Sequence, residues 1–223
     1  MKRVKVKICG IRTLEEAEAA ISAGAHALGF NFWPRSARYV EPLAVQEFIK
    51  RLSPLISTVG VFVDEDANRI MSIASQLGLQ AIQLHGDESP GFCELLKSIK
   101  TIKAFRVSED FDLSVINKYH VDMALLDSNV NGRYGGTGQR FDWRIAVEAK
   151  KLSPIILAGG LTLENVGDAI KQVQPNAIDV CSGVEAEPGR KDLDKIQAFM
   201  NIVNQTNSLL AEDHDFSGQE SFI

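Results

Sequence analysis

The sequence predicts an α/β protein that folds as a single (β/α)8 barrel of the TIM type. Strand-like and helix-like segments alternate eight times over roughly the first 205 residues, with short connections between them. Strict alternation of this kind is typical of a parallel sheet with right-handed crossovers. The 223 residues, 45% of them hydrophobic, suffice for one sizeable core. An open doubly wound sheet is the alternative, but eight evenly spaced units are more than such a sheet usually needs.

The expected strands are short apolar runs, and the first of them is the most informative. It alternates apolar and charged residues, ends at Cys9 and breaks at Gly10. Strands are expected at residues 4–9, 27–30, 58–63, 81–84, 101–105, 123–127, 154–158 and 177–181. Helical patterns are expected at residues 14–23, 44–52, 67–76, 91–98, 113–118, 143–151, 163–173 and 193–203. The last two helices each carry one apolar face, formed by Leu163, Val166, Ala169, Ile170 and Val173, and by Leu193, Ile196, Phe199, Met200 and Val203.

Charge divides the chain into a body and a tail. We assign residues 1–205 to one barrel-shaped catalytic domain, because no linker interrupts them. Residues 206–223 hold four acids and no lysine or arginine, and we expect a flexible acidic C-terminal tail there. Removing these four negative charges from the net charge of −5 leaves −1 for the body. A nearly neutral body without a basic stripe makes a nucleic-acid partner unexpected.

Apolar segments, cysteine spacing and nucleotide-binding motifs limit the expected location and chemistry of the protein. No stretch approaches the roughly 18 uninterrupted apolar residues of a membrane helix, and no apolar segment of a signal peptide follows the N-terminus. We therefore expect no membrane association. The three cysteines are widely spaced, which predicts neither a disulfide framework nor a metal site and fits the reducing cytoplasm. The sequence contains neither a dinucleotide fingerprint nor a nucleotide P-loop.

Cys9 is the first candidate catalytic residue. In a parallel barrel the active site is built from the C-terminal ends of the strands, and Cys9 ends the first strand. Lys7 lies two residues earlier on the same face of that strand, where its charge could favour the thiolate. The alternative is that Cys9 is a small buried hydrophobe, as most free cysteines are.

Asp127 is the second candidate. It closes an apolar strand, and a carboxylate at a strand tip that faces a pocket can act as a general acid. Opposite Cys9 it would complete an acid–base pair. The alternative is an Asx-turn or cap residue, since Ser128 and Asn129 follow.

The loops after the last two strands indicate a phosphate site. Gly159 and Gly160 follow the seventh strand, and Ser182 and Gly183 follow the eighth. Barrels of this kind hold phosphate in these two loops, where glycine lets backbone N–H groups approach the anion. A tight turn or a helix entry is the alternative for the Gly159–Gly160 pair.

Other polar residues follow the strand ends. Arg35 and Arg38 could bind a carboxylate or phosphate of the substrate, or could belong to a solvated loop. His85 could be an acid–base group or a cap. The glycine-rich loop at residues 131–138, next to Asp127, could be a lid.

Together these segments resemble one enzyme family. The matching stretches are residues 7–12, 29–32, 36–39, 59–63, 83–88, 126–127, 135–138, 141–143, 157–161 and 179–185. They run in unbroken order from residue 4 to about residue 204, and they resemble phosphoribosylanthranilate isomerase, the (β/α)8 enzyme of tryptophan biosynthesis.

The resemblance implies an Amadori rearrangement of N-(5-phosphoribosyl)anthranilate to an open-chain deoxyribulose phosphate. It implies that Asp127 is the general acid that opens the furanose ring, and that Cys9 is the general base that removes the C2 proton. Arg38 is similar to the residue that contacts the anthranilate end. His85 and Asp179 match positions in the substrate site, and Gly159, Gly160, Ser182 and Gly183 resemble the phosphate cradle. No metal and no redox cofactor are implied, and a monomer or homodimer is expected.

Two other functions stay open at this point. The isomerase of histidine biosynthesis performs the same rearrangement on a bulkier substrate, but it has an aspartate where Cys9 stands and a phosphate site in each half-barrel. A non-catalytic barrel that binds a phosphorylated metabolite is the alternative from a different class.

Overall fold

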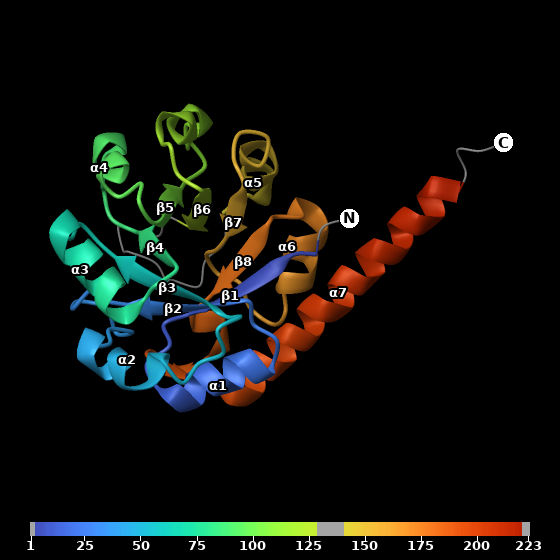
Figure 1. Ribbon diagram of the computed structural model, residues 1–223. Coiled ribbons are helices and arrows are strands. Elements are labelled where there is room, and N and C mark those ends of the chain that lie inside the picture. Colours follow the sequence, from blue (N-terminus) through green and yellow to red (C-terminus); the bar gives the residue numbers. More distant parts are fainter. Residues whose placement is uncertain (1–2, 129–140, 220–223) are drawn as a thin grey trace.

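The computed structural model describes residues 3–128 and 141–219, with side chains up to residue 212. Eight parallel strands close into a barrel in sequence order, each paired with the next and the last with the first (Figure 1). The strands are β1 (Lys5–Cys9), β2 (Ala27–Asn31), β3 (Ser57–Phe62), β4 (Ala81–Leu84), β5 (Lys100–Val107), β6 (Met123–Ser128), β7 (Ile155–Leu157) and β8 (Ala177–Val180). The expected (β/α)8 fold is confirmed, and the open sheet is excluded by the β1–β8 pairing.

Helices surround the barrel and alternate with its strands. They are α1 (Leu14–Ser22), α2 (Pro42–Ile49), α3 (Ala67–Leu77), α4 (Pro90–Leu95), the 3-10 helix η1 (Leu113–Lys118), α5 (Trp143–Ala149), α6 (Val166–Val173) and α7 (Leu193–Gln219). Several begin after a polar residue whose side-chain oxygen accepts a backbone N–H of the first turn, namely Thr13, Asp66, Ser89, Asp112 and Asp142. Apart from the C-terminal end of α7, the boundaries agree with the sequence expectations to within a few residues, and η1 lies at the expected residues but as a 3-10 helix.

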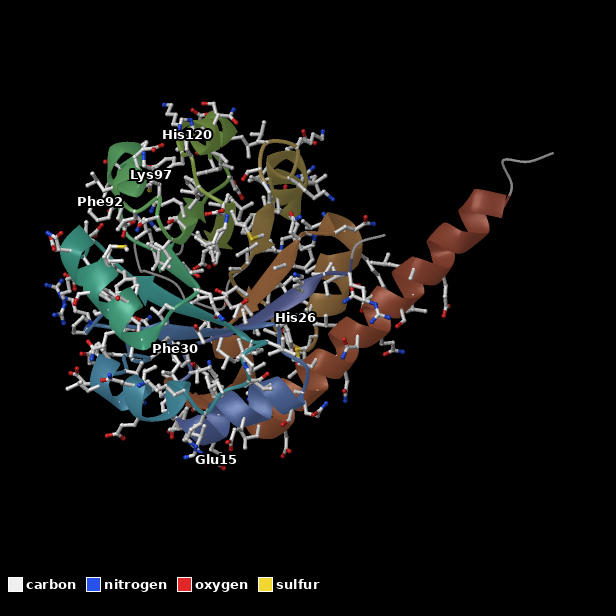
Figure 2. The ribbon with its side chains drawn as sticks, viewed as in Figure 1. Glu15, His26, Phe30, Phe92, Lys97 and His120 are labelled. Carbon is white, nitrogen blue, oxygen red and sulfur yellow. The ribbon has the colours of Figure 1, made fainter. Side chains whose placement is uncertain are left out.

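Two layers of apolar side chains hold the barrel together. The larger lies between the strands and the helices and includes Phe30 of β2, which is labelled in Figure 2. The Phe30 ring packs on Phe48 of α2 with ring centroids 6.1 Å apart. The smaller lies inside the barrel and consists of Val59, Ile102, Ala104, Leu125, Ile156 and Ala158. Asp127 follows Leu125 by two residues on β6 and therefore shares its inward face. The same alternation turns both Lys7 and Cys9 of β1 inward.

A small hairpin after β8 is absent from the sequence expectations. The 3-10 helix η2 (Ser182–Val184) leads into β9 (Glu185–Glu187), which pairs antiparallel with β10 (Arg190–Lys191). These strands are short and carry mainly charged residues, so no apolar alternation marks them. Gly189, with φ of +86°, makes the turn between them.

The C-terminal segment differs from the expected tail boundary. Helix α7 does not end near Val203 but continues to Gln219 and extends beyond the barrel (Figure 1). Between residues 204 and 217 the chain has no glycine or proline, so its composition permits a helix despite its acidity. The inward face continues past Val203 through buried Thr206 and Asn207 to half-buried Leu210. The proposed boundary at residue 205 therefore falls inside a packed helix, and residues 220–223 lie outside the described part.

Asn207 fastens α7 to the first strand. Its Oδ1 accepts the N–H of Val4 at 3.0 Å, and its Nδ2 donates to the carbonyl of Val4 at 3.1 Å. We expect Asn207→Ala to lower the free energy of unfolding by about 2–4 kcal/mol, because it leaves two buried backbone groups without partners. Urea unfolding followed by circular dichroism measures the change.

The neighbouring Ser208→Ala variant is the matched control. Ser208 is exposed and bonds only within its own helix, to the carbonyl of Asn204, so a change within about 0.5 kcal/mol is expected. An Asn207→Ala variant as stable as this control would contradict the assigned role.

Candidate active site

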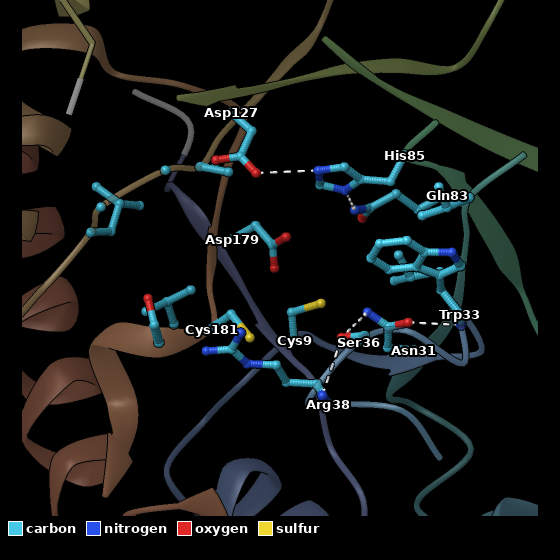
Figure 3. A pocket seen from close by; sticks show the side chains of 18 residues that line it. Cys9, Asn31, Trp33, Ser36, Arg38, Gln83, His85, Asp127, Asp179 and Cys181 are labelled. Atoms are coloured by element: carbon cyan, nitrogen blue, oxygen red, sulfur yellow. Dashed lines mark hydrogen bonds and ion pairs between the residues drawn. The ribbon is translucent and has the colours of Figure 1, made fainter. Parts of the chain in front are cut away.

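A pocket opens among the carboxyl ends of the barrel strands (Figure 3). Its lining includes the sequence-predicted site residues Cys9, Arg38, His85, Asp127, Gly159, Gly160, Asp179 and Ser182. Gly183, also predicted, does not line the pocket but supports the loop behind it. Arg35 is exposed and is not among the lining residues, whereas Arg38 is half-buried and faces the pocket. Cys9 and Asp127 lie on opposite sides of the pocket (Figure 3).

Cys9 is surrounded by groups that favour its thiolate. The Cys181 thiol, and after it the Lys7 ammonium, lower the pKa of Cys9 from the ordinary 9.0 to about 7, although burial acts in the opposite direction. The pKa of Cys181 is raised, because the negative charge of Cys9 and burial both disfavour a second thiolate. Cys9 is therefore the thiol of the pair that ionises near neutral pH.

Gly29 makes room for this arrangement. It is the partner of Cys9 on β2, and a Cβ at this position would lie 2.8 Å from the Sγ of Cys9 and 3.0 Å from the Cε of Lys7. Any larger residue would therefore displace the thiol or the lysine. The absence of a side chain at residue 29 lets Cys9 and Lys7 lie side by side inside the barrel.

Lys7 is a buried cation with three anionic or polar neighbours. Its Nζ lies 2.9 Å from Oδ2 of Asp179 and 2.8 Å from Oε1 of Gln83. Burial alone would lower the pKa of Lys7, but the Asp179 carboxylate and then Cys9 raise it above its ordinary value. The positive charge of Lys7 is therefore favoured beside Cys9.

The lysine begins a polar chain that crosses the barrel. Because an ammonium only donates, Gln83 must accept with its oxygen, which leaves its Nε2 to donate to Nδ1 of His85 at 2.8 Å. The proton of a neutral His85 then resides on Nε2, which lies 3.2 Å from Oδ2 of Asp127 (Figure 3). This places the histidine's N–H toward the carboxylate, although the alignment is not that of an ideal hydrogen bond.

Asp127 is held at its other oxygen by its own strand. The backbone N–H of Ser128 donates to Oδ1 at 2.8 Å, and the Asp127 side chain is 7% exposed. The Ser128 N–H and the His85 ring therefore lie at the two different oxygens of the Asp127 carboxyl group.

The two glycine-containing loops pack against each other. Gly159 and Gly160 have φ of +79° and +65°, and a Cβ on Gly159 would overlap the backbone of Ser128. Gly183 lies against the carbonyl of Leu161, where a Cβ would also overlap. Asn165 fixes the turn by donating to the Gly160 carbonyl at 2.8 Å.

These loops present backbone donors to the pocket. Among the described residues, the N–H groups of Gly160, Leu161, Ser182 and Gly183 donate to no protein acceptor. Successive N–H groups of this kind form a concave site for an anion. Sequence reasoning therefore found the loops, and the structure adds that their donors are free.

Sequence reasoning assigned no role to Gln83, Cys181 or Glu185. Gln83 and Cys181 are visible as polar residues at strand ends, but their importance comes from partners far away along the chain. Gln83 contacts Lys7, 76 residues away, and Cys181 contacts Cys9. Glu185 lies on the unpredicted hairpin. The possible lid at residues 131–138 lies outside the described residues.

Within the described ranges, no group of three or more His, Cys, Asp and Glu side chains is arranged to hold a metal ion. Across the same ranges, no helix combines the length and the apolar character needed to cross a membrane.

Comparison with known proteins identifies relatives over nearly the whole chain. A family model described as N-(5'phosphoribosyl)anthranilate (PRA) isomerase matches residues 6–202. The N-(5'-phosphoribosyl)anthranilate isomerase of a Geobacter species is 47% identical over 196 residues, which are 88% of this chain and 96% of the relative.

Solved structures agree with the sequence comparison. Monomers generated from the dimeric phosphoribosylanthranilate isomerase of Thermotoga maritima align with a TM-score of 0.81 at 38% identity, covering 91% of this chain and 99% of that one. A phosphoribosyl anthranilate isomerase in complex with reduced 1-(o-carboxyphenylamino)-1-deoxyribulose 5-phosphate aligns with a TM-score of 0.82 at 39% identity and the same coverage.

The thiolate at Cys9 can be tested directly by alkylation. With a pKa of about 7, the rate of modification by iodoacetamide should rise about tenfold from pH 6 to pH 8 and then level off, because the thiolate is the nucleophile. Peptide mass spectrometry at timed intervals measures the rate at each cysteine.

Cys93 provides the internal comparison in the same sample. Burial raises its pKa to about 11, so its modification should be slower and should still be increasing above pH 8. A rate at Cys9 that keeps climbing like that of an ordinary thiol would contradict its activation.

Proposed function

The chain belongs to the N-(5'-phosphoribosyl)anthranilate isomerase family, the aldose–ketose isomerases of tryptophan biosynthesis, and we propose that Asp127 and Cys9 perform the two proton transfers of its reaction. The observation that carries the proposal is their position on opposite sides of one pocket, with a thiolate-favouring environment on the Cys9 side only. In this role they convert N-(5'-phosphoribosyl)anthranilate to 1-(2-carboxyphenylamino)-1-deoxyribulose 5-phosphate.

The first step is ring opening by Asp127. Its carboxyl group protonates the furanose ring oxygen, the bond from that oxygen to C1 breaks, and the aromatic amine and C1 become a protonated Schiff base. His85 and the N–H of Ser128 support this step, because both stabilise the carboxylate that Asp127 becomes.

The second step is proton abstraction by Cys9. The thiolate removes the proton from C2, and the electron pair neutralises the Schiff base to give an enolamine, which tautomerises to the ketone. Lys7 supports the step because its charge maintains the thiolate before the proton is taken.

The two ends of the substrate are both anionic, and we assign each to a separate part of the pocket. The phosphate binds to the free backbone donors near Gly159, Gly160, Ser182 and Gly183, and the anthranilate carboxylate binds to Arg38. Between them His85 and Asp179 contact the sugar. Oδ1 of Asp179 is buried and has no partner among the described residues, so it can accept a substrate hydroxyl.

Assembly and location follow from the relatives and the thiols. The structural neighbour from Thermotoga maritima is a monomeric form of a dimeric enzyme, which supports a monomer or a homodimer here. All three cysteines are free, which supports a cytoplasmic location.

The roles of Cys9 and Asp127 are tested by removing each group. We expect Cys9→Ala and Asp127→Asn each to lower kcat by about 10²–10⁴-fold, the usual contribution of a general acid or base. Loss of anthranilate fluorescence with freshly prepared phosphoribosylanthranilate measures the rate above spontaneous hydrolysis.

Matched substitutions on the same chain serve as controls. Cys93→Ala removes a buried thiol that does not line the pocket, and Asp122→Asn alters a carboxylate at the opposite end of the barrel from the pocket, just before β6. Both should turn over at near wild-type rates. Wild-type turnover by either site variant would contradict the assignment for that residue.

The pH dependence of kcat/KM should report the base. Cys9 must be ionised to accept a proton and Asp127 must be protonated to give one. The Cys9 thiolate fraction increases as pH rises through about 7, so the slope of log kcat/KM against pH should change near pH 7. A profile with no change of slope between pH 5.5 and 8 would contradict Cys9 as the titrating base.

A further inference from the structure

Arg38 is held by a buried carboxylate on the hairpin that follows β8. Glu185 accepts two hydrogen bonds from the guanidinium, from Nε at 3.1 Å and from Nη2 at 2.7 Å. The carboxylate side chain is 4% exposed and that of Arg38 is 17% exposed. Two parallel bonds fix both the position and the plane of the guanidinium, which a single contact would not do.

The two hydrogen bonds to Glu185 leave one edge of the Arg38 guanidinium available to the pocket. The described hydrogen bonds of its side chain use Nε and Nη2, both directed at Glu185. The Nη1 donors have no acceptor among the described residues, and Arg38 lines the pocket (Figure 3). Glu185 therefore orients Arg38 so that a donor edge remains for a ligand.

Lys191 adds a positive charge to the Arg38–Glu185 pair. Its Nζ lies 3.1 Å from Oε1 of Glu185 and 3.0 Å from the carbonyl of Cys181, and its side chain is fully buried. An arginine paired with a carboxylate alone is neutral and attracts an anion weakly. With Lys191 present, the cluster of two cations and one anion keeps a net charge of +1.

The hairpin is anchored so that this cluster cannot shift freely. Lys191 faces Glu185 across the β9–β10 pair, and its N–H donates to the Glu16 carboxylate at 2.9 Å. The Nζ of Lys195 on α7 donates to the carbonyl of Glu185, also at 2.9 Å. Two helices therefore fix the position of the carboxylate that fixes Arg38.

We propose that Glu185 and Lys191 are positioning residues that make Arg38 selective for a carboxylate on the aromatic amine of the substrate. Glu185 supplies the geometry and Lys191 preserves the positive charge. This inference rests on the proposed function only in that it takes Arg38 as the binding group for the anthranilate end.

The test compares two non-reacting ligands on the intact protein. One is reduced 1-(2-carboxyphenylamino)-1-deoxyribulose 5-phosphate, and the other is the same compound with an unsubstituted phenyl ring. Titration calorimetry gives Kd for each ligand with the wild type and with Glu185→Gln, Lys191→Met, Arg38→Ala and Glu187→Gln. Because nothing reacts, the result is independent of the roles of Cys9 and Asp127.

Glu185→Gln should raise the Kd of the carboxylate-bearing ligand about tenfold, which is the scale of one misplaced charge-assisted hydrogen bond. This loss is expected although the substitution makes the cluster more positive, so it separates positioning from simple attraction. Lys191→Met should raise the Kd of the same ligand about fivefold, because the remaining Arg38–Glu185 pair is neutral. Both variants should bind the unsubstituted phenyl ligand within about twofold of wild type.

The control lies on the same hairpin. Glu187 is exposed and pairs with the exposed Arg190, so Glu187→Gln should change neither Kd. Thermal unfolding of each variant establishes that it is folded.

Three results would overturn the inference. If Glu185→Gln and Lys191→Met lower the affinity for both ligands equally, the cluster only supports the fold. Unchanged or tighter binding of the carboxylate-bearing ligand to Glu185→Gln would mean that Arg38 needs no orienting partner. If Arg38→Ala lowers the affinity for both ligands equally, Arg38 does not bind the carboxylate. Failure of the proposed proton transfers would appear only in the kinetics of the Cys9 and Asp127 variants.

Discussion

The arrangement of the pocket depends on one buried ammonium group, that of Lys7. A lysine that is 3% exposed is costly unless its charge is compensated, and here Asp179, Gln83 and Cys9 compensate it. Each of these groups belongs to a different position around the barrel, on β8, β4 and β1. The lysine thus requires the barrel to be closed between β1 and β8, and the closed barrel in turn keeps a positive charge beside the thiol.

The same lysine influences the opposite side of the pocket through hydrogen-bond polarity. An ammonium can only donate, which fixes the orientation of the Gln83 amide and, through it, the tautomer of His85. His85 then offers an N–H to Asp127. In the proposed mechanism the group that favours the thiolate of the base also prepares the partner of the acid. Acid and base are therefore supported by one connected set of contacts rather than by two independent ones.

The sequence predicts the fold and the outline of the site for identifiable physical reasons. Alternating apolar patterns mark the eight strands, and parallel strands bring all their carboxyl ends to one face, so Cys9, Asp127 and the glycine loops could be found at the strand ends. Contacts between side chains that are distant along the chain cannot be predicted in this way. Nothing local in the sequence pairs Lys7 with Asp179 or Arg38 with Glu185, because those contacts depend on strand register and on a hairpin without apolar pattern. The extension of α7 cannot be predicted in this way either, because an acidic C-terminal segment without lysine or arginine is typical of a flexible tail.

Charge is distributed over the pocket in a way that suits a substrate with an anion at each end. In the proposed function, the free N–H groups of the β7 and β8 loops are neutral donors that hold the phosphate without a countercharge near the base. The only net cationic cluster that we assign to ligand binding, Arg38 with Glu185 and Lys191, is fixed by buried contacts. Lys7, by contrast, is largely neutralised by Asp179 and by the Cys9 thiolate. In the proposed arrangement the phosphate takes the backbone donors and the anthranilate carboxylate takes Arg38. The sugar joins these two ends, and it therefore lies between Asp127 and Cys9.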